Sequence, residues 1–103
     1  MLSKNPLDIP VQRKLSKDEV AQALRLSIIA ELDAINLYLQ LANSIEDERI
    51  KKVFEDIARE EKTHVGEFLA LLKEYDPQQL EELEKGEDEV RELIGESRKS
   101  KSE

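Results

Sequence analysis

The chain has 103 residues, a formal net charge of −8 at pH 7, no cysteine, and equal 39% shares of hydrophobic and charged residues. This length allows one small domain, and the acidic balance argues against nucleic acid as a partner, because phosphate binding needs clustered Lys and Arg. The lack of cysteine excludes disulfides, thiolate metal ligands and thiol nucleophiles.

The start of the chain shows no targeting or membrane segment. Residues 1–10 read MLSKNPLDIP and lack the apolar core of a signal peptide. Elsewhere, no apolar run approaches the roughly 20 residues that cross a bilayer. We therefore expect a soluble, cytoplasmic protein with no membrane partner.

The N-terminal segment is predicted to be an extended arm that leads into a first helix. Residues 1–15 contain Pro6 and Pro10 and show no hydrophobic period. Ser16 followed by Glu19 is the pattern of a capping box, in which each side chain bonds the other residue's backbone N–H. A helix is therefore predicted from residue 17 to about residue 43.

The apolar residues of this first helix lie on more than one face. The main stripe consists of Val20, Leu24, Ile28, Ile35, Tyr38 and Ala42, and the opposite side carries Leu26, Ile29 and Leu37. A helix that is apolar on several faces must be buried from several directions, and one hairpin cannot supply that cover. The pattern therefore predicts self-association.

A second helix is predicted to begin near Asp47, where acidic residues suit a helix N-terminus, and to run to Asp76. Gly66 is its one weak position, tolerated at a cost of about 1 kcal/mol relative to Ala. With a turn near Ile45, the two long helices form an antiparallel hairpin.

A third, shorter helix is predicted after the hairpin. Asp76 and Pro77 are typical of an N-cap and a first helical residue, and we expect Gly86 to divide this helix and Gly95 to end it. The predicted fold is all-α, with one helical domain over residues 16–95 and a disordered polar tail over residues 96–103.

Polar residues interrupt the apolar stripes of both long helices. At about 100° per residue, one narrow stripe of the second helix holds Ile50, Val53, Ile57, Phe68, Leu71 and Tyr75. His64 lies in the middle of that stripe, and Glu61 lies toward one side of it. Glu31 lies at the centre of the main stripe of the first helix.

Counting from the turn places these three residues at one level. Glu31 lies 14 residues before Ile45, and Glu61 and His64 lie 16 and 19 residues after it. At about 1.5 Å per residue, these distances differ by only about a turn of helix. An antiparallel hairpin therefore brings all three side chains together on its shared face.

Two carboxylates and one imidazole at a common level indicate a metal site. A buried carboxylate needs a partner, and no Lys or Arg lies on the same face. Glu61 and His64 alone are more simply a satisfied pair, but Glu31 at the same level favours a divalent metal. The Glu-x-x-His spacing fits, because residues i and i+3 project from one side of a helix.

One hairpin supplies half of the ligands that a two-metal centre uses. Di-iron carboxylate bundles take a Glu from each of two helices and a Glu-x-x-His from each of two others. A two-fold homodimer of this chain, forming a ferritin-like four-helix bundle, would supply four carboxylates and two imidazoles. The pattern therefore predicts a two-metal centre between two copies.

Two segments of the sequence resemble the encapsulated ferritin family. They are ELDAINLY, from Glu31 to Tyr38, and EEKTH, from Glu60 to His64, and the similarity extends over about residues 17–95. The resemblance implies a ferroxidase that oxidises Fe(II) with oxygen at a di-iron centre between two subunits. It also implies a ring, a decamer built from five dimers, and mineral storage inside an encapsulin shell.

The resemblance also assigns roles to single residues. It implies that Glu31, Glu61 and His64 are the iron ligands and that Tyr38 lies beside the centre. Asp33 corresponds to an acidic residue near the site where metal enters, and the second acidic residue of that site is Ala30 here. ESRKSKSE at the C-terminus shows no encapsulation peptide, so either the targeting signal is unusual or the chain is a domain of a shell fusion.

Two other functions remain open from the sequence. A helical adaptor could use buried polar residues only to fix the register of its helices. A di-metal peroxidase of the rubrerythrin type could use the same ligands, although the lack of cysteine removes the rubredoxin centre that such enzymes usually carry. The same ligands also accept manganese or zinc.

Overall fold

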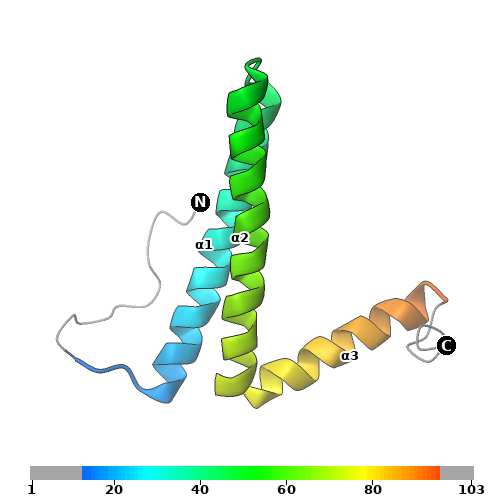
Figure 1. Ribbon diagram of the computed structural model, residues 1–103. Helices are drawn as coiled ribbons and strands as arrows, with labels where there is room; N and C mark the ends of the chain where they lie inside the picture. The colour runs from blue at the N-terminus through cyan, green and yellow to red at the C-terminus, as the bar shows by residue number, and fades with distance from the viewer. Residues whose placement is uncertain (1–12, 96–103) are drawn as a thin grey trace.

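The computed structural model describes residues 13–95 as an antiparallel helical hairpin with a third helix that projects from its base (Figure 1). The helices are α1 (Lys17–Ser44), α2 (Glu48–Tyr75) and α3 (Pro77–Leu93). The all-α fold and its helix order agree with the prediction. The predicted arm over residues 1–12 and the predicted tail over residues 96–103 lie outside the described residues.

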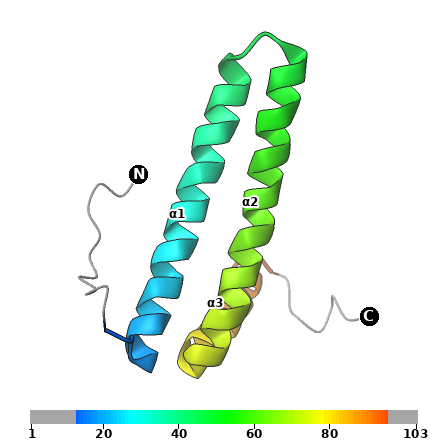
Figure 2. The same ribbon diagram turned by 60° about the vertical axis from the view of Figure 1, so that its left-hand side comes forward.

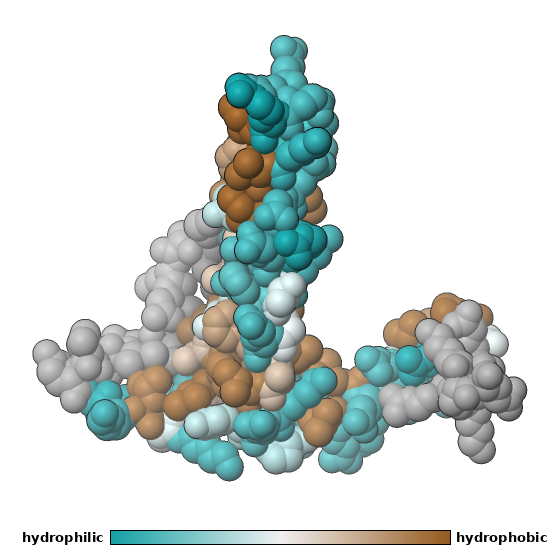
Figure 3. Space-filling view, in the orientation of Figure 1, coloured by the Kyte–Doolittle hydropathy of each residue, from teal (hydrophilic) through white to brown (hydrophobic). Residues whose placement is uncertain are grey.

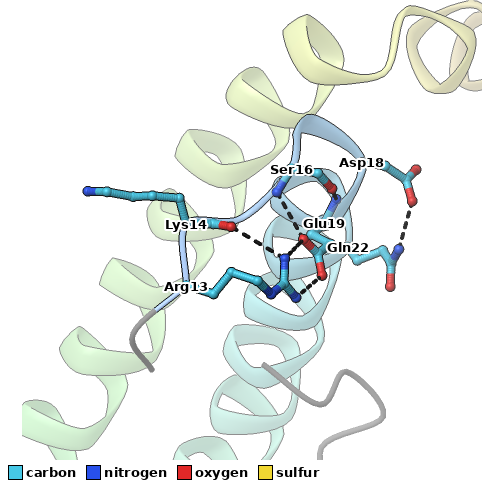
Figure 4. Close-up of polar contacts among 6 residues, drawn as sticks. All are labelled: Arg13, Lys14, Ser16, Asp18, Glu19 and Gln22. Carbon is cyan, nitrogen blue, oxygen red and sulfur yellow. Dashed lines mark hydrogen bonds and ion pairs between the residues drawn. The ribbon is translucent and has the colours of Figure 1, made fainter. Parts of the chain in front are cut away.

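The first helix begins with the capping box that the sequence predicts. The Glu19 backbone N–H donates to Ser16 Oγ at 3.1 Å, and the Ser16 backbone N–H donates to Glu19 Oε1 at 2.9 Å. The Arg13 guanidinium adds two hydrogen bonds, of 2.7 and 2.6 Å, to the two carboxylate oxygens of Glu19 (Figure 4). The capping box satisfies the backbone N–H groups of Ser16 and Glu19, which would otherwise be unpaired at the start of α1.

The hairpin packs through small side chains along a narrow seam. α1 and α2 lie side by side in both views of the ribbon (Figures 1 and 2). The buried core of the described residues consists of Ala21, Ile35, Ala42, Ala58 and Leu72. Three of these five are alanine, which lets the two backbones approach closely but buries little apolar area. The seam therefore aligns the helices without covering their larger apolar side chains.

Large apolar side chains remain exposed on both long helices, as the brown areas of the upper hairpin show (Figure 3). On α1 and α2 they are Ile29, Leu32, Leu37, Leu39, Leu41, Ile50, Val53, Leu71 and Tyr75. The centre of the apolar stripe of α2 thus lies beside the seam rather than in it. A single hairpin leaves this stripe open, as the two-faced pattern of the sequence predicts.

The third helix is continuous, so the predicted division at Gly86 is wrong. α3 runs from Pro77 to Leu93 through Gly86, where an added Cβ atom would meet no described atom within 4 Å. A mid-helix glycine costs only about 1 kcal/mol relative to Ala, which the hydrogen bonds of the flanking turns outweigh. Gly95, with a φ of 83°, follows the end of the helix as predicted.

None of these helices is long and apolar enough to cross a membrane, over the part of the chain that the structure describes.

The contacts of Glu19 make the stability of the hairpin depend on acid pH. Hydrogen bonds from Arg13, followed by the Ser16 backbone N–H, lower the pKa of Glu19 from 4.5 to about 2. The unfolded carboxylate therefore takes up a proton first as the pH falls. The stabilisation is fully present above about pH 4.5 and is lost as the pH falls toward 2. Urea unfolding of Glu19→Gln against the parent chain should show a difference at pH 6 that shrinks toward pH 2.

The matched control for this measurement is Glu55→Gln, which changes an exposed acidic residue in the middle of α2. A pH-dependent difference of the same size in both variants would show that general acid titration, and not the Arg13 contact, carries the effect.

Candidate metal centre

The hairpin brings Glu31 of α1 to the level of Glu61 and His64 of α2. His64 Nδ1 lies 3.5 Å from Oε2 of Glu31 and 3.5 Å from Oε2 of Glu61. One ligand atom from each of the three residues lies within 4.8 Å of the others. The common level follows from the nearly equal chain lengths on either side of the turn. The three side chains therefore form one cluster, the Glu31–Glu61–His64 cluster.

The two carboxylates are largely buried, whereas the imidazole is half exposed. The exposed fractions of the side chains are 22% for Glu31, 18% for Glu61 and 45% for His64. The Oε2 atom of Glu31 is buried and accepts no hydrogen bond from any described residue. A buried carboxylate oxygen without a donor is costly, and a bound cation removes that cost.

The distances within the cluster fit metal ligands better than hydrogen-bonded partners. An N–H···O hydrogen bond spans about 2.7–3.2 Å, so a contact of 3.5 Å is too long. Two ligands that each lie about 2.1 Å from an ion, at a tetrahedral angle, are about 3.4 Å apart. Two carboxylates and one imidazole also suit a divalent iron, manganese or zinc ion. The residues present therefore fit a metal ion.

The cluster is open on one side. His64 shares its stripe of α2 with the exposed side chains of Val53 and Leu71. The carboxylates of Glu31 and Glu61 are instead mostly shielded from solvent. One hairpin therefore supplies three ligands from one side and leaves the imidazole side uncovered.

The remaining predicted site residues lie outside the cluster. Tyr38 is half-buried, and its ring packs against Phe54 with centroids 5.9 Å apart and planes tilted by 39°. Asp33 is half-buried on α1 and does not belong to the ligand group. Sequence reasoning did not pair Phe54 with Tyr38, although their similar distances from the turn would have allowed it.

The sequence matches the family described as Rubrerythrin over residues 22–99. A solved structure, the encapsulated ferritin domain from Pyrococcus furiosus, is 54% identical with a TM-score of 0.82, and the match covers 94% of this chain and 99% of that one. The chain belongs to the encapsulated ferritin family.

Two curated relatives of this encapsulated ferritin chain are longer proteins. A ferritin-like-encapsulin shell fusion protein of Pyrococcus furiosus is 56% identical over 95 residues, which is 92% of this chain and 28% of that protein. The encapsulin nanocompartment cargo protein EncC of Myxococcus xanthus is 38% identical over 79 residues, or 77% of this chain and 61% of that one. The chain thus spans less than two thirds of either relative.

A metal ion that fills the cluster should stabilise the fold. With Zn²⁺ as a redox-inert probe, the midpoint of thermal unfolding should rise, because a ligand at 100 times its Kd stabilises by about 2.7 kcal/mol. Glu31→Gln keeps the side-chain shape but removes the charged ligand, so most of this rise should disappear. Without metal, Glu31→Gln should be at least as stable as the parent, because it removes a buried charge.

The matched control is Glu60→Gln, one residue before Glu61 on α2 and exposed. It should keep the full Zn²⁺ response. Equal loss of the response in both variants would mean that Zn²⁺ binds the general acidic surface instead of the cluster.

Proposed function

We propose that this chain is a ferroxidase that takes Fe(II) as its substrate and oxidises it to Fe(III) with oxygen. The observation that carries the proposal is the convergence of Glu31, Glu61 and His64, with a buried carboxylate oxygen that has no described hydrogen-bond donor. Membership of the encapsulated ferritin family supports it.

A second copy of the chain completes the centre. Two hairpins related by a two-fold axis form a four-helix bundle, in which four carboxylates and two imidazoles surround two iron ions. The half-exposed His64 and the apolar side chains beside it would then be covered by the partner. The same contact buries Val53 and Leu71, which a single hairpin leaves open.

The protein residues position the iron and balance its charge. Two Fe(II) ions give up one electron each, and one oxygen molecule accepts the two electrons with two protons to leave as hydrogen peroxide. The redox chemistry belongs to iron, whereas the chain supplies geometry and charge. Four carboxylates favour the more highly charged Fe(III) product, because they lie in a site partly shielded from water. Tyr38, whose ring packs on Phe54, is proposed to border the site from two helical turns along α1.

The chain is proposed to work inside an encapsulin compartment in the cytoplasm. The two curated relatives are, by name, a shell fusion protein and a cargo protein of such a compartment. We propose that Fe(III) made at the centre is stored as mineral within the shell. The dimers are proposed to assemble further into a ring of ten subunits. Asp33, half-buried on α1, is proposed to guide the incoming metal.

The rubrerythrin-type peroxidase is the second candidate, because the matching family is described as Rubrerythrin. It predicts that hydrogen peroxide oxidises the bound iron faster than oxygen does. The adaptor without metal is the third candidate, and it predicts that Fe(II) changes neither the oligomeric state nor the thermal stability.

Removal of two proposed ligands should slow the reaction strongly. In stopped-flow measurements, the double variant Glu31→Ala/His64→Ala should oxidise Fe(II) with oxygen more slowly than the parent chain. The loss should be at least roughly 10–100-fold, because changes to residues that only support metal ligands already cost that much. Glu60→Ala is the matched control and should react like the parent chain. An unchanged rate in the double variant would refute the proposed mechanism, and a preference for peroxide over oxygen would favour the peroxidase.

A further inference from the structure

The joint between α2 and α3 is a single residue, Asp76. Its backbone N–H donates to the carbonyl of Leu72 at 2.8 Å and so closes the last turn of α2. Its side chain accepts a hydrogen bond of 3.3 Å from the Gln79 backbone N–H and so caps α3. Pro77, at the first position of α3, has no N–H group and cannot continue α2. The chain therefore changes direction sharply at Asp76 (Figure 1).

The first helix reaches across to this joint through one side chain. Arg25 Nη2 donates to Asp76 Oδ2, and Arg25 Nε donates to Gln79 Oε1 at 3.4 Å. Both partners lie in or just before the first turn of α3, although they are 51 and 54 residues from Arg25 in the chain. The pair is partly shielded, with exposed side-chain fractions of 40% for Arg25 and 26% for Asp76.

Apolar packing does little to fix the direction of α3. Leu80, Val90 and Leu93 are exposed, and Leu93 at the tip is 87% exposed. In Figure 1 the helix points away from the hairpin along most of its length. The charged contact of Arg25 at the base is therefore the interaction best placed to set its angle, because small angular changes at the joint move the whole helix.

We propose that Arg25 is a latch, meaning that its hydrogen bonds to Asp76 and Gln79 hold α3 at a fixed angle to the hairpin. Without the latch, α3 keeps its helix and its cap but swings about Asp76. The latch thereby determines where the exposed apolar side chains of α3 face. It acts on the arrangement of the helices and does not depend on metal at the cluster.

Spin-label distances test the latch directly, because the chain has no cysteine of its own. Lys62→Cys on α2 and Glu89→Cys on α3 are both exposed positions that can carry labels. The labelled full chain is diluted into excess unlabelled chain, so that only distances within one subunit contribute. The parent should give a narrow distance distribution, and Arg25→Gln should broaden it.

Two further variants separate the latch from simple loss of the helix. Asp76→Asn removes the charge, but Asn caps a helix as well as Asp does, so it should broaden the distribution with unchanged helix content by circular dichroism. Arg49→Gln, which removes a contact to Asp47 at the far end of the hairpin, should leave the distribution narrow. An unchanged distribution in Arg25→Gln would overturn the proposal, as would broadening that comes with melting of α3.

Discussion

The structure depends on one constraint, the presence of two carboxylates beside a single imidazole between two packed helices. A buried oxygen of Glu31 has no hydrogen-bond donor among the described residues, and both carboxylates face the same nitrogen of His64. Apolar side chains of similar size would cost less free energy at these positions. A bound metal ion is therefore the best explanation of the cluster. The hairpin is the scaffold that holds Glu31 of α1 opposite Glu61 and His64 of α2.

The second constraint is that one hairpin buries few of its own large apolar side chains. Its seam is lined mainly by alanines, while Ile29, Leu37 and Val53 stay exposed on several sides. A folded chain rarely leaves so much apolar surface open unless another surface covers it. The open side of the Glu31–Glu61–His64 cluster lies on the same stripe as Val53, so in the proposed dimer one contact would both cover the stripe and complete the ligand set. In the proposed dimer, the stability of the fold and the formation of the site are therefore coupled.

Local signals in the sequence predicted the helices well. Ser16 with Glu19, and Asp76 with Pro77, place helix ends within a residue because caps act over one turn. The level of the cluster followed from residue counts on either side of the turn. The continuity of α3 through Gly86 did not follow, because a glycine lowers helix propensity by too little to break a helix that both flanks support. The exposure of His64 could not be predicted, because a periodic stripe does not show whether the same chain or a second copy covers it. The contact of Arg25 with Asp76 could not be predicted either, because the two residues are 51 positions apart in the sequence.

Anomalous diffraction at the iron edge, on crystals of the full chain loaded with Fe(II) without oxygen, would show whether two copies share one di-iron centre. We expect a pair of iron peaks across a two-fold axis, with Glu31, Glu61 and His64 from both copies around them. Iron held within one hairpin alone, or iron only at sites away from this cluster, would contradict it.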